Sequence, residues 1–198
     1  EMSASLVGSE MCIRDSLVSD ARDAIANALG VTPDEVYFTS GATESNNTAI
    51  FGAYKAHGKR KKRVVISSVE HPAVKNPAQE LEDMGCEVIR ISPDENGEIN
   101  ARDIFAAVNE DTFLVSCMLV NNENGYILPV EKAFSMIKKK YPQVLTHCDC
   151  VQGFMKIPVK AKKLNADMIS LSGHKIYAPK GIGAVSYTHL TLPTTERV

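Results

Sequence analysis

Strand-like and helix-like segments alternate along almost the whole of this 198-residue chain, and no other feature of the sequence constrains the fold as strongly. Such alternation is typical of a three-layer α/β fold, in which helices cover both faces of a mainly parallel sheet. Ligands of these folds bind at the carboxyl ends of the strands, so functional residues are expected there. The β-prone runs cover residues 36–39, 64–67, 87–91, 112–118, 144–147 and 167–171. The helical patterns cover residues 17–29, 44–57, 101–108 and 130–140, and one more opens at Pro72.

The composition is that of one ordinary globular domain, with 44% hydrophobic and 23% charged residues. The formal net charge of -2 argues against nucleic acid or an anionic membrane as a partner. One basic run, residues 59–63, is interpreted as a solvated loop, the alternative being a nucleic-acid or targeting patch. No stretch approaches the roughly 20 apolar residues of a membrane helix. Because the five cysteines are scattered and too few for a disulfide scaffold, we expect reduced thiols and a cytoplasmic location.

Both ends of the chain resemble translated sequencing-adapter read-through, most clearly in residues 11–16 and 185–194. Residues 1–16 and 185–198 are therefore predicted to be non-native flanks, and ordered structure is expected to begin near Leu17. The alternative is a genuine N-terminal arm and C-terminal strand. Residues 17–184 are then expected to form an incomplete domain.

The segment 41–47 lies where a predicted strand becomes a helix. Unpaired backbone amides at Ala42 and Thr43 could hold a phosphate there, helped by the helix dipole and the Thr43 hydroxyl. The alternative is a capped helix start, in which Thr43 or Ser45 bonds the first-turn amides.

Lys175 follows the apolar strand predicted at 167–171, within the sequence Ser-Gly-His-Lys that begins at Ser172. A lysine at this strand end would lie in a cleft, and burial there would lower its pKa and free the amine for Schiff-base chemistry. The alternative is an ordinary lysine of a surface loop.

Three other predicted strands end in polar groups that suit the same chemistry. Asp149 follows one strand, with Gln152 after it, whereas His71 and Asn122 follow two others. In pyridoxal phosphate enzymes a lysine holds the cofactor and an Asp pairs with the pyridinium nitrogen. Lys175 and Asp149 are predicted to be that pair, with a ring-stacking His71 and an amide from Asn122 beside them.

The sequence His-Cys-Asp-Cys at 147–150 could suggest a metal site, but no second pair of ligands has matching spacing. Alternate residues of a strand also point to opposite faces, which separates these four side chains. No metal site is predicted.

Five ordered motifs together resemble the cysteine desulfurases, which belong to the class V aminotransferases and have the fold type I architecture of pyridoxal phosphate enzymes. The chain is thereby interpreted as the large cofactor-binding domain of such a transferase, over about residues 17–184. The motifs are residues 41–47, 70–71, 121–123, 147–152 and 172–175.

The resemblance implies a role for nine residues around pyridoxal 5'-phosphate. Lys175 and His71 would be the catalytic residues, with Lys175 bound to the cofactor and His71 stacked on its ring. Asp149 would pair with the ring nitrogen, and Gln152 and Asn122 would contact the ring hydroxyl. The phosphate would be bound by Ala42, Thr43, Ser172 and His174.

The resemblance also implies an activity and partners. The family converts L-cysteine to L-alanine and passes a persulfide sulfur to an acceptor or scaffold protein for iron–sulfur cluster or other sulfur-carrier synthesis, working as a homodimer.

Leu128 and Ala178 depart from the family pattern, where Gln and Gly are usual. The persulfide loop, the small C-terminal domain and the partner's phosphate-binding segment are not matched by this sequence. The parent protein is therefore expected to be an enzyme and this chain to be inactive.

Two alternatives remain open on the sequence. The motifs contact the cofactor rather than the substrate, so another class V enzyme, such as a selenocysteine lyase or an aminotransferase, would show them too. A non-catalytic protein that keeps the fold is the other alternative, although Lys175 and Asp149 are both retained.

Overall fold

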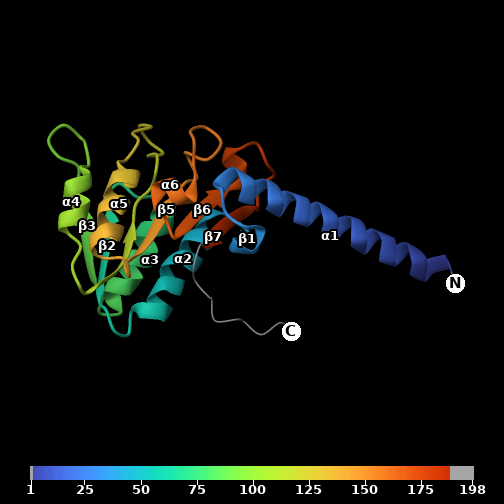
Figure 1. Cartoon of the computed structure of the whole chain (residues 1–198), viewed down its shortest axis with the longest axis horizontal. Coiled ribbons are helices and arrows are strands. Elements are labelled where there is room, and N and C mark those ends of the chain that lie inside the picture. The colour runs from blue at the N-terminus through green and yellow to red at the C-terminus, as the bar shows by residue number, and fades with distance from the viewer. Residues whose placement is uncertain (1, 188–198) are drawn as a thin grey trace.

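The computed structural model describes the backbone of residues 2–187 and the side chains of residues 15–187. Helices and strands alternate as the sequence predicts (Figure 1). The helices are α1 (Met2–Leu29), α2 (Ala42–His57), α3 (Pro72–Asp83), α4 (Ala101–Ala106), α5 (Val130–Lys140) and α6 (Ala161–Leu164), with short 3₁₀ turns η1 (Pro33–Glu35) and η2 (Gly173–Lys175). The strands are β1 (Val36–Thr39), β2 (Arg63–Ser67), β3 (Glu87–Ile91), β4 (Thr112–Ser116), β5 (Leu145–Asp149), β6 (Met168–Ser172) and β7 (Gly183–Tyr187).

All seven strands form one sheet in the order β1-β7-β6-β5-β4-β2-β3. The pairings among β2, β3, β4, β5 and β6 are parallel, whereas β7 runs antiparallel to both of its neighbours. The prediction of a mainly parallel sheet is confirmed. The parallel strands bring their carboxyl ends to one edge of the sheet, which is where the polar motifs follow them.

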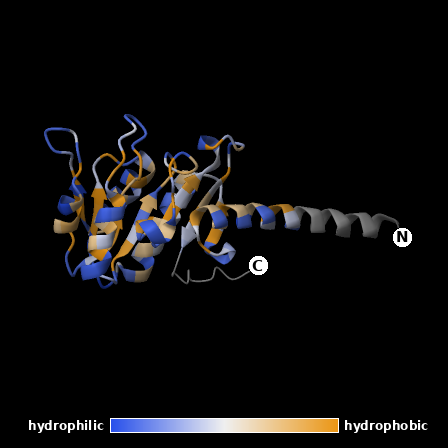
Figure 2. Cartoon of the chain, turned by 45° about the horizontal axis from the view of Figure 1, so that its top comes forward, coloured by the Kyte–Doolittle hydropathy of each residue, from blue (hydrophilic) through white to orange (hydrophobic). Residues whose placement is uncertain are grey.

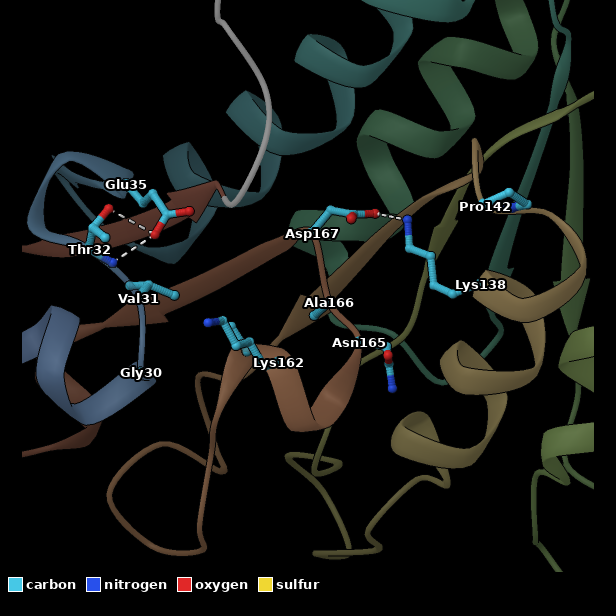
Figure 3. Close-up of a pocket in the computed structure, with 11 residues that line it drawn as sticks. Gly30, Val31, Thr32, Glu35, Lys138, Pro142, Lys162, Asn165, Ala166 and Asp167 are labelled. Carbon is cyan, nitrogen blue, oxygen red and sulfur yellow. Dashed lines mark hydrogen bonds and ion pairs between the residues drawn. The ribbon is translucent and has the colours of Figure 1, made fainter.

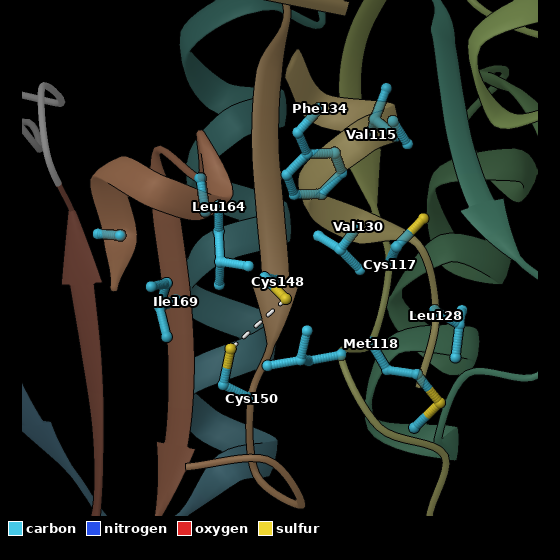
Figure 4. Packing of buried hydrophobic residues seen from close by; sticks show 14 of the residues in the cluster. Val115, Cys117, Met118, Leu128, Val130, Phe134, Cys148, Cys150, Leu164 and Ile169 are labelled. Atoms are coloured by element: carbon cyan, nitrogen blue, oxygen red, sulfur yellow. Dashed lines mark hydrogen bonds between the residues drawn. The ribbon is translucent and has the colours of Figure 1, made fainter. Parts of the chain in front are cut away.

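The two faces of the sheet have separate hydrophobic cores, because side chains alternate between faces along each strand. In β2, Val64 and Ile66 belong to the core beneath α2 and α3, and Val65 belongs to the other core. That second core includes Phe134 of α5 and Leu164 of α6 (Figure 4). Figure 2 shows hydrophobic residues concentrated on the strands and hydrophilic ones on the loops. The predicted three-layer arrangement is confirmed.

Some predicted boundaries are wrong. The first helix begins at Met2 rather than near Leu17, because residues 2–16 contain no proline to stop it, and it projects from the body of the domain (Figure 1). Strand β4 ends at Ser116 rather than at Met118, and α2 begins at Ala42 rather than at Glu44.

The C-terminal run predicted to be foreign falls partly inside β7, since Val185, Ser186 and Tyr187 continue that strand. Residues 188–198 lie outside the described residues. The assignment of residues 1–16 and 185–198 to non-native flanks stays a prediction.

No helix among residues 2–187 is both long and apolar enough to cross a membrane.

Candidate functional site

A cavity of about 360 Å³ opens at the carboxyl ends of β2, β4, β5 and β6, beside the start of α2. Every residue that the sequence predicts for the cofactor site lines this cavity, although the residues come from five separate segments of the chain. The nine residues are Ala42, Thr43, His71, Asn122, Asp149, Gln152, Ser172, His174 and Lys175.

Ala42 and Thr43 form the first turn of α2, and Gly41 precedes them without a side chain that could cap the helix. The Glu44 carboxylate turns back to the Ser40 amide and hydroxyl, each at 2.6 Å, and the Ser45 hydroxyl bonds Thr39 at 2.8 Å. The alternative of a first turn capped by Thr43 or Ser45 is therefore wrong. The first-turn amides and the positive end of the helix dipole face the cavity, an arrangement that favours an anion.

Asp149 ends β5 and is only 5% exposed. One carboxylate oxygen accepts from Asn46 Nδ2 at 2.8 Å and the other from the Val151 amide at 3.0 Å. Burial raises the pKa of Asp149, whereas its two hydrogen bonds and the nearby His71 oppose that shift. Within residues 15–187 no lysine or arginine forms an ion pair with this carboxylate. A cationic ligand group in the cavity would supply the missing partner.

His71 precedes α3 and caps it, because its Nδ1 accepts a hydrogen bond from the Ala73 amide at 3.1 Å. Accepting through Nδ1 places the proton of the neutral ring on Nε2. The ring itself is exposed and lines the cavity. It is therefore free to lie against a planar ligand.

Lys175 lies in η2, just beyond β6, and its side chain is exposed while it lines the cavity. The prediction of a lysine at a strand end in a cleft is confirmed, but the expectation that it is buried is wrong. Lys175 is exposed because it lies in the η2 turn, beyond the end of β6, rather than on the sheet itself. Next to it, the Ser172 hydroxyl and His174 Nδ1 lie 2.7 Å apart and form a second polar edge of the cavity.

Gln152 and Asn122 complete the lining from the segments after β5 and β4. Gln152 is half-buried, and its Oε1 accepts a hydrogen bond from Lys156 Nζ at 3.1 Å. Within the described residues its amide nitrogen donates no hydrogen bond. Asn122 is exposed at the cavity rim.

The sequence interpretation gave no role to three buried polar residues near the site: Asn46, Glu70 and His147. Asn46 holds Asp149, and His147 lies between the hydroxyls of Ser116 at 2.8 Å and Ser170 at 2.9 Å. Burial lowers the pKa of His147 to about 3 and raises that of Glu70 to about 8. Asn46, Glu70 and His147 each lie inside one of the five motifs, and that adjacency was the available signal.

The Cys148 and Cys150 sulfurs lie 3.4 Å apart in the core shown in Figure 4, on the face of β5 opposite to His147 and Asp149. Burial raises the pKa of the Cys148 thiol, which disfavours the thiolate that binds metals. Within the described part of the chain, no group of three or more His, Cys, Asp or Glu residues could hold a metal ion.

A larger cavity of about 680 Å³ lies at the other end of the sheet, before β6 (Figure 3). One of its two lysines, Lys138, is already engaged, by the Asp167 carboxylate and by the Val144 carbonyl at 2.7 Å. None of the nine predicted residues lines this cavity.

Comparison with known proteins identifies a family for this chain. The aminotransferase class-V family matches residues 11–197 of the chain. The cysteine desulfurase IscS of Serratia proteamaculans (strain 568) is 43% identical over 171 residues, which is 86% of this chain and 42% of that protein. IscS of Escherichia coli (strain K12 / DH10B) is 42% identical over the same length. The chain thus spans less than half the length of these curated relatives.

Solved structures give the same result. A NifS-like protein superposes with a TM-score of 0.84 at 39% identity, covering 89% of this chain and 49% of that one. The structure described as SspA in complex with cysteine superposes with a TM-score of 0.85 at 37% identity, covering 91% of this chain and 51% of that one. The chain therefore belongs to the class-V aminotransferase family and is similar, over the part that it spans, to the family's cysteine desulfurases.

Proposed function

We propose that this chain is the pyridoxal phosphate-binding part of a cysteine desulfurase. The observation that carries the proposal is the convergence of nine residues from five segments on one cavity. Those residues include an amine, a buried carboxylate, an exposed imidazole and the start of a 16-residue helix. Each group matches one part of the cofactor: its aldehyde, ring nitrogen, ring face and phosphate.

The polar groups present fit pyridoxal phosphate. Asp149 is a buried carboxylate without an ion-paired lysine or arginine in the described chain, so it suits a protonated ring nitrogen. The start of α2, together with Ser172 and His174, suits a phosphate. When bound, the cofactor supplies an electron sink for the bond changes at the substrate α-carbon.

The chain's own residues would then bind and move protons. His71 would fix the plane of the cofactor ring, since its Nδ1 is already held by the α3 backbone. The Lys175 amine is exposed in the cavity, where it would take the proton from the α-carbon of the substrate. Asn122 and Gln152 would contact the ring hydroxyl and orient it.

The proposed substrate is L-cysteine. An enzyme thiol takes the substrate sulfur, so that L-cysteine and the thiol become L-alanine and a persulfide. Cys86, Cys117, Cys148 and Cys150 are buried and none lines the cavity, so we propose that the accepting thiol is not one of these four. The persulfide sulfur would pass to an acceptor or scaffold protein in the cytoplasm, from an enzyme that acts as a homodimer. By itself the 198-residue chain is expected to bind cofactor without turning over cysteine.

The first experiment adds pyridoxal phosphate to the purified chain and follows the visible absorbance of lysine-bound cofactor. Borohydride then fixes the bond, and peptide mass mapping finds the labelled residue. We expect the label on Lys175 and none in Lys175→Ala. Label spread over several surface lysines, in a sample shown to be folded, would contradict the assignment. Assaying alanine, sulfide and selenide release by the full-length protein then separates a desulfurase from another class V enzyme.

A further inference from the structure

Two buried side chains join the segment after β2 to the segment after β4. Glu70 is 2% exposed, and its Oε1 accepts from the Met118 amide at 2.7 Å and from the Ser67 hydroxyl. Asn121, which is 8% exposed, donates from Nδ2 to the Val69 carbonyl at 3.1 Å. The two segments therefore lie side by side at one wall of the cavity.

His71 lies next to this connection in the chain. It directly follows Glu70, and among the described residues its side chain hydrogen-bonds only to the Ala73 amide two residues ahead. That bond is local to the start of α3 and does not tie the ring to any other wall of the cavity. The contact from Glu70 to Met118 ties the backbone next to His71 to the segment after β4.

We propose that Glu70 is a positioning residue, which holds the His71 ring at the cavity wall by joining the segment after β2 to the end of β4. The inference rests on the proposed function, in which His71 lies against the cofactor ring. Glu70 does not itself line the cavity, so it acts through His71 and Met118.

The contacts of Glu70 show which variants test this role. Its Oε2 has no hydrogen-bond partner in the described chain. The charged and titratable groups that face it are Asp149 of β5, Lys75 of α3 and the Cys117 thiol after β4. Because both hydrogen bonds use a single oxygen, a neutral amide can replace the carboxyl group. Glu70→Gln should keep the connection, and Glu70→Ala should remove it.

The experiment compares these variants in the 198-residue chain by NMR of the His71 ring, assigned with His71→Asn. Asp167→Asn is the control, because it removes an ion pair at the opposite end of the sheet (Figure 3). We expect the His71 ring signals to shift and broaden in Glu70→Ala only. Pyridoxal phosphate affinity should fall by about tenfold in the same variant, the scale of one lost buried hydrogen bond.

Several outcomes would overturn the role of Glu70. They are unchanged His71 signals in folded Glu70→Ala, an equal change in Asp167→Asn, and an equal change in Glu70→Gln. If Glu70→Ala does not fold, Glu70→Asp replaces it, because the shorter side chain cannot reach Met118 and Ser67 together. If the unaltered chain binds no pyridoxal phosphate, the proposed function fails for this chain, and the NMR comparison still decides whether Glu70 positions His71.

Discussion

Glu70 and His147 are buried ionisable residues whose pKa values move in opposite directions for the same reason. Burial disfavours the charged form of each, so the pKa of Glu70 rises to about 8 and that of His147 falls to about 3. Near neutral pH most of the Glu70 population and nearly all of the His147 population are therefore uncharged. Asp149 and Lys175, by contrast, line the cavity.

The Glu70 carboxyl should make the unaltered chain less stable as the pH rises. The unfolded chain releases this proton near pH 4.5, whereas the folded chain holds it until about pH 8. Between those values each pH unit lowers the free energy of unfolding by up to about 1.4 kcal/mol, and the loss ends above the folded pKa. Glu70→Gln has no such proton. Its free energy of unfolding should therefore rise relative to that of the unaltered chain between about pH 5 and pH 8.

Urea unfolding of both chains across that range measures the difference directly. A constant difference would mean that Glu70 is ionised in the folded chain throughout. His147→Gln is the matched control. The contribution of His147 to the free energy of unfolding changes with pH only below the ordinary histidine pKa of 6.5, so above that pH it stays constant.

At the residue scale, the sequence predicted which side chains share the cavity but not their protonation. Polar groups that follow parallel strands must meet at one edge, so the convergence of Asp149 and Lys175 follows from topology alone. The state of Glu70 depends on burial and on the Met118 amide, 48 residues away. No local pattern carries that information.

At the scale of elements, α3 and the proposed cofactor site share His71, which caps the helix with Nδ1 and faces the cavity with its ring. The two tasks can be separated. His71→Asn should keep the cap, because its short amide oxygen can accept from the Ala73 amide, but it has no ring. His71→Phe should keep a ring and lose the cap, which costs about 1 kcal/mol.

Chemical unfolding and cofactor titration of both variants test this separation. We expect His71→Phe to lower the free energy of unfolding more than His71→Asn does. We expect His71→Asn to weaken pyridoxal phosphate binding more than His71→Phe does. The same ranking in both measurements would show that the ring and the cap do not act independently.

Strand β7 packs closely against the turn before α2. A Cβ added at Gly183 would lie 2.6 Å from the Gly41 carbonyl carbon and 2.8 Å from Thr39 Oγ1. Gly183→Ala should therefore cost about 1–3 kcal/mol and displace the start of α2. Gly85→Ala, at φ +88 with open space around it, is the control, because its backbone strain costs about 1–2 kcal/mol far from the cavity.

Only Gly183→Ala should weaken pyridoxal phosphate binding, although both variants should melt at lower temperature. Equal cofactor affinity in the two variants would show that the start of α2 does not contribute to the phosphate site.

The sequence predicted the strands up to β6 better than it predicted the shortest helix and the last strand. Strands β1 to β6 are short β-prone runs, and each lies within a few residues of its predicted range. Helix α6, only 4 residues long, and the antiparallel strand β7 were not predicted. A single helical turn has no detectable period, and the direction of a strand depends on its neighbours rather than on its own residues.

At the scale of the whole molecule, α1 and the adjacent sheet edge expose apolar surface. Leu17 and Val18 are 63% and 48% exposed and line a mostly apolar cavity of about 680 Å³ with Phe38 and Ile182. Surface of this kind favours association. We expect the chain to self-associate in sedimentation velocity as its concentration rises.

Leu17→Glu should reduce that association, because it places a charge on the apolar surface. Met84→Glu is the control, since Met84 is 52% exposed but lies after α3 and away from this cavity. An equal effect of the two substitutions would indicate general solubility rather than a specific surface.

Strand β1 has one partner in the sheet, β7, which lies about 150 positions further along the chain, so that Val36 pairs with Ser186 and Thr39 with Gly183. During synthesis β1 therefore emerges long before its partner, whereas β2 through β6 can pair among themselves as they emerge. The start of α2 follows β1 directly, so β7, which pairs with both β1 and β6, links the start of α2 to the Lys175 side of the cavity, in addition to the hydrogen bond from Asn46 to Asp149. Under the proposed function, we expect a chain that ends before Gly183 to bind pyridoxal phosphate more weakly than the 198-residue chain.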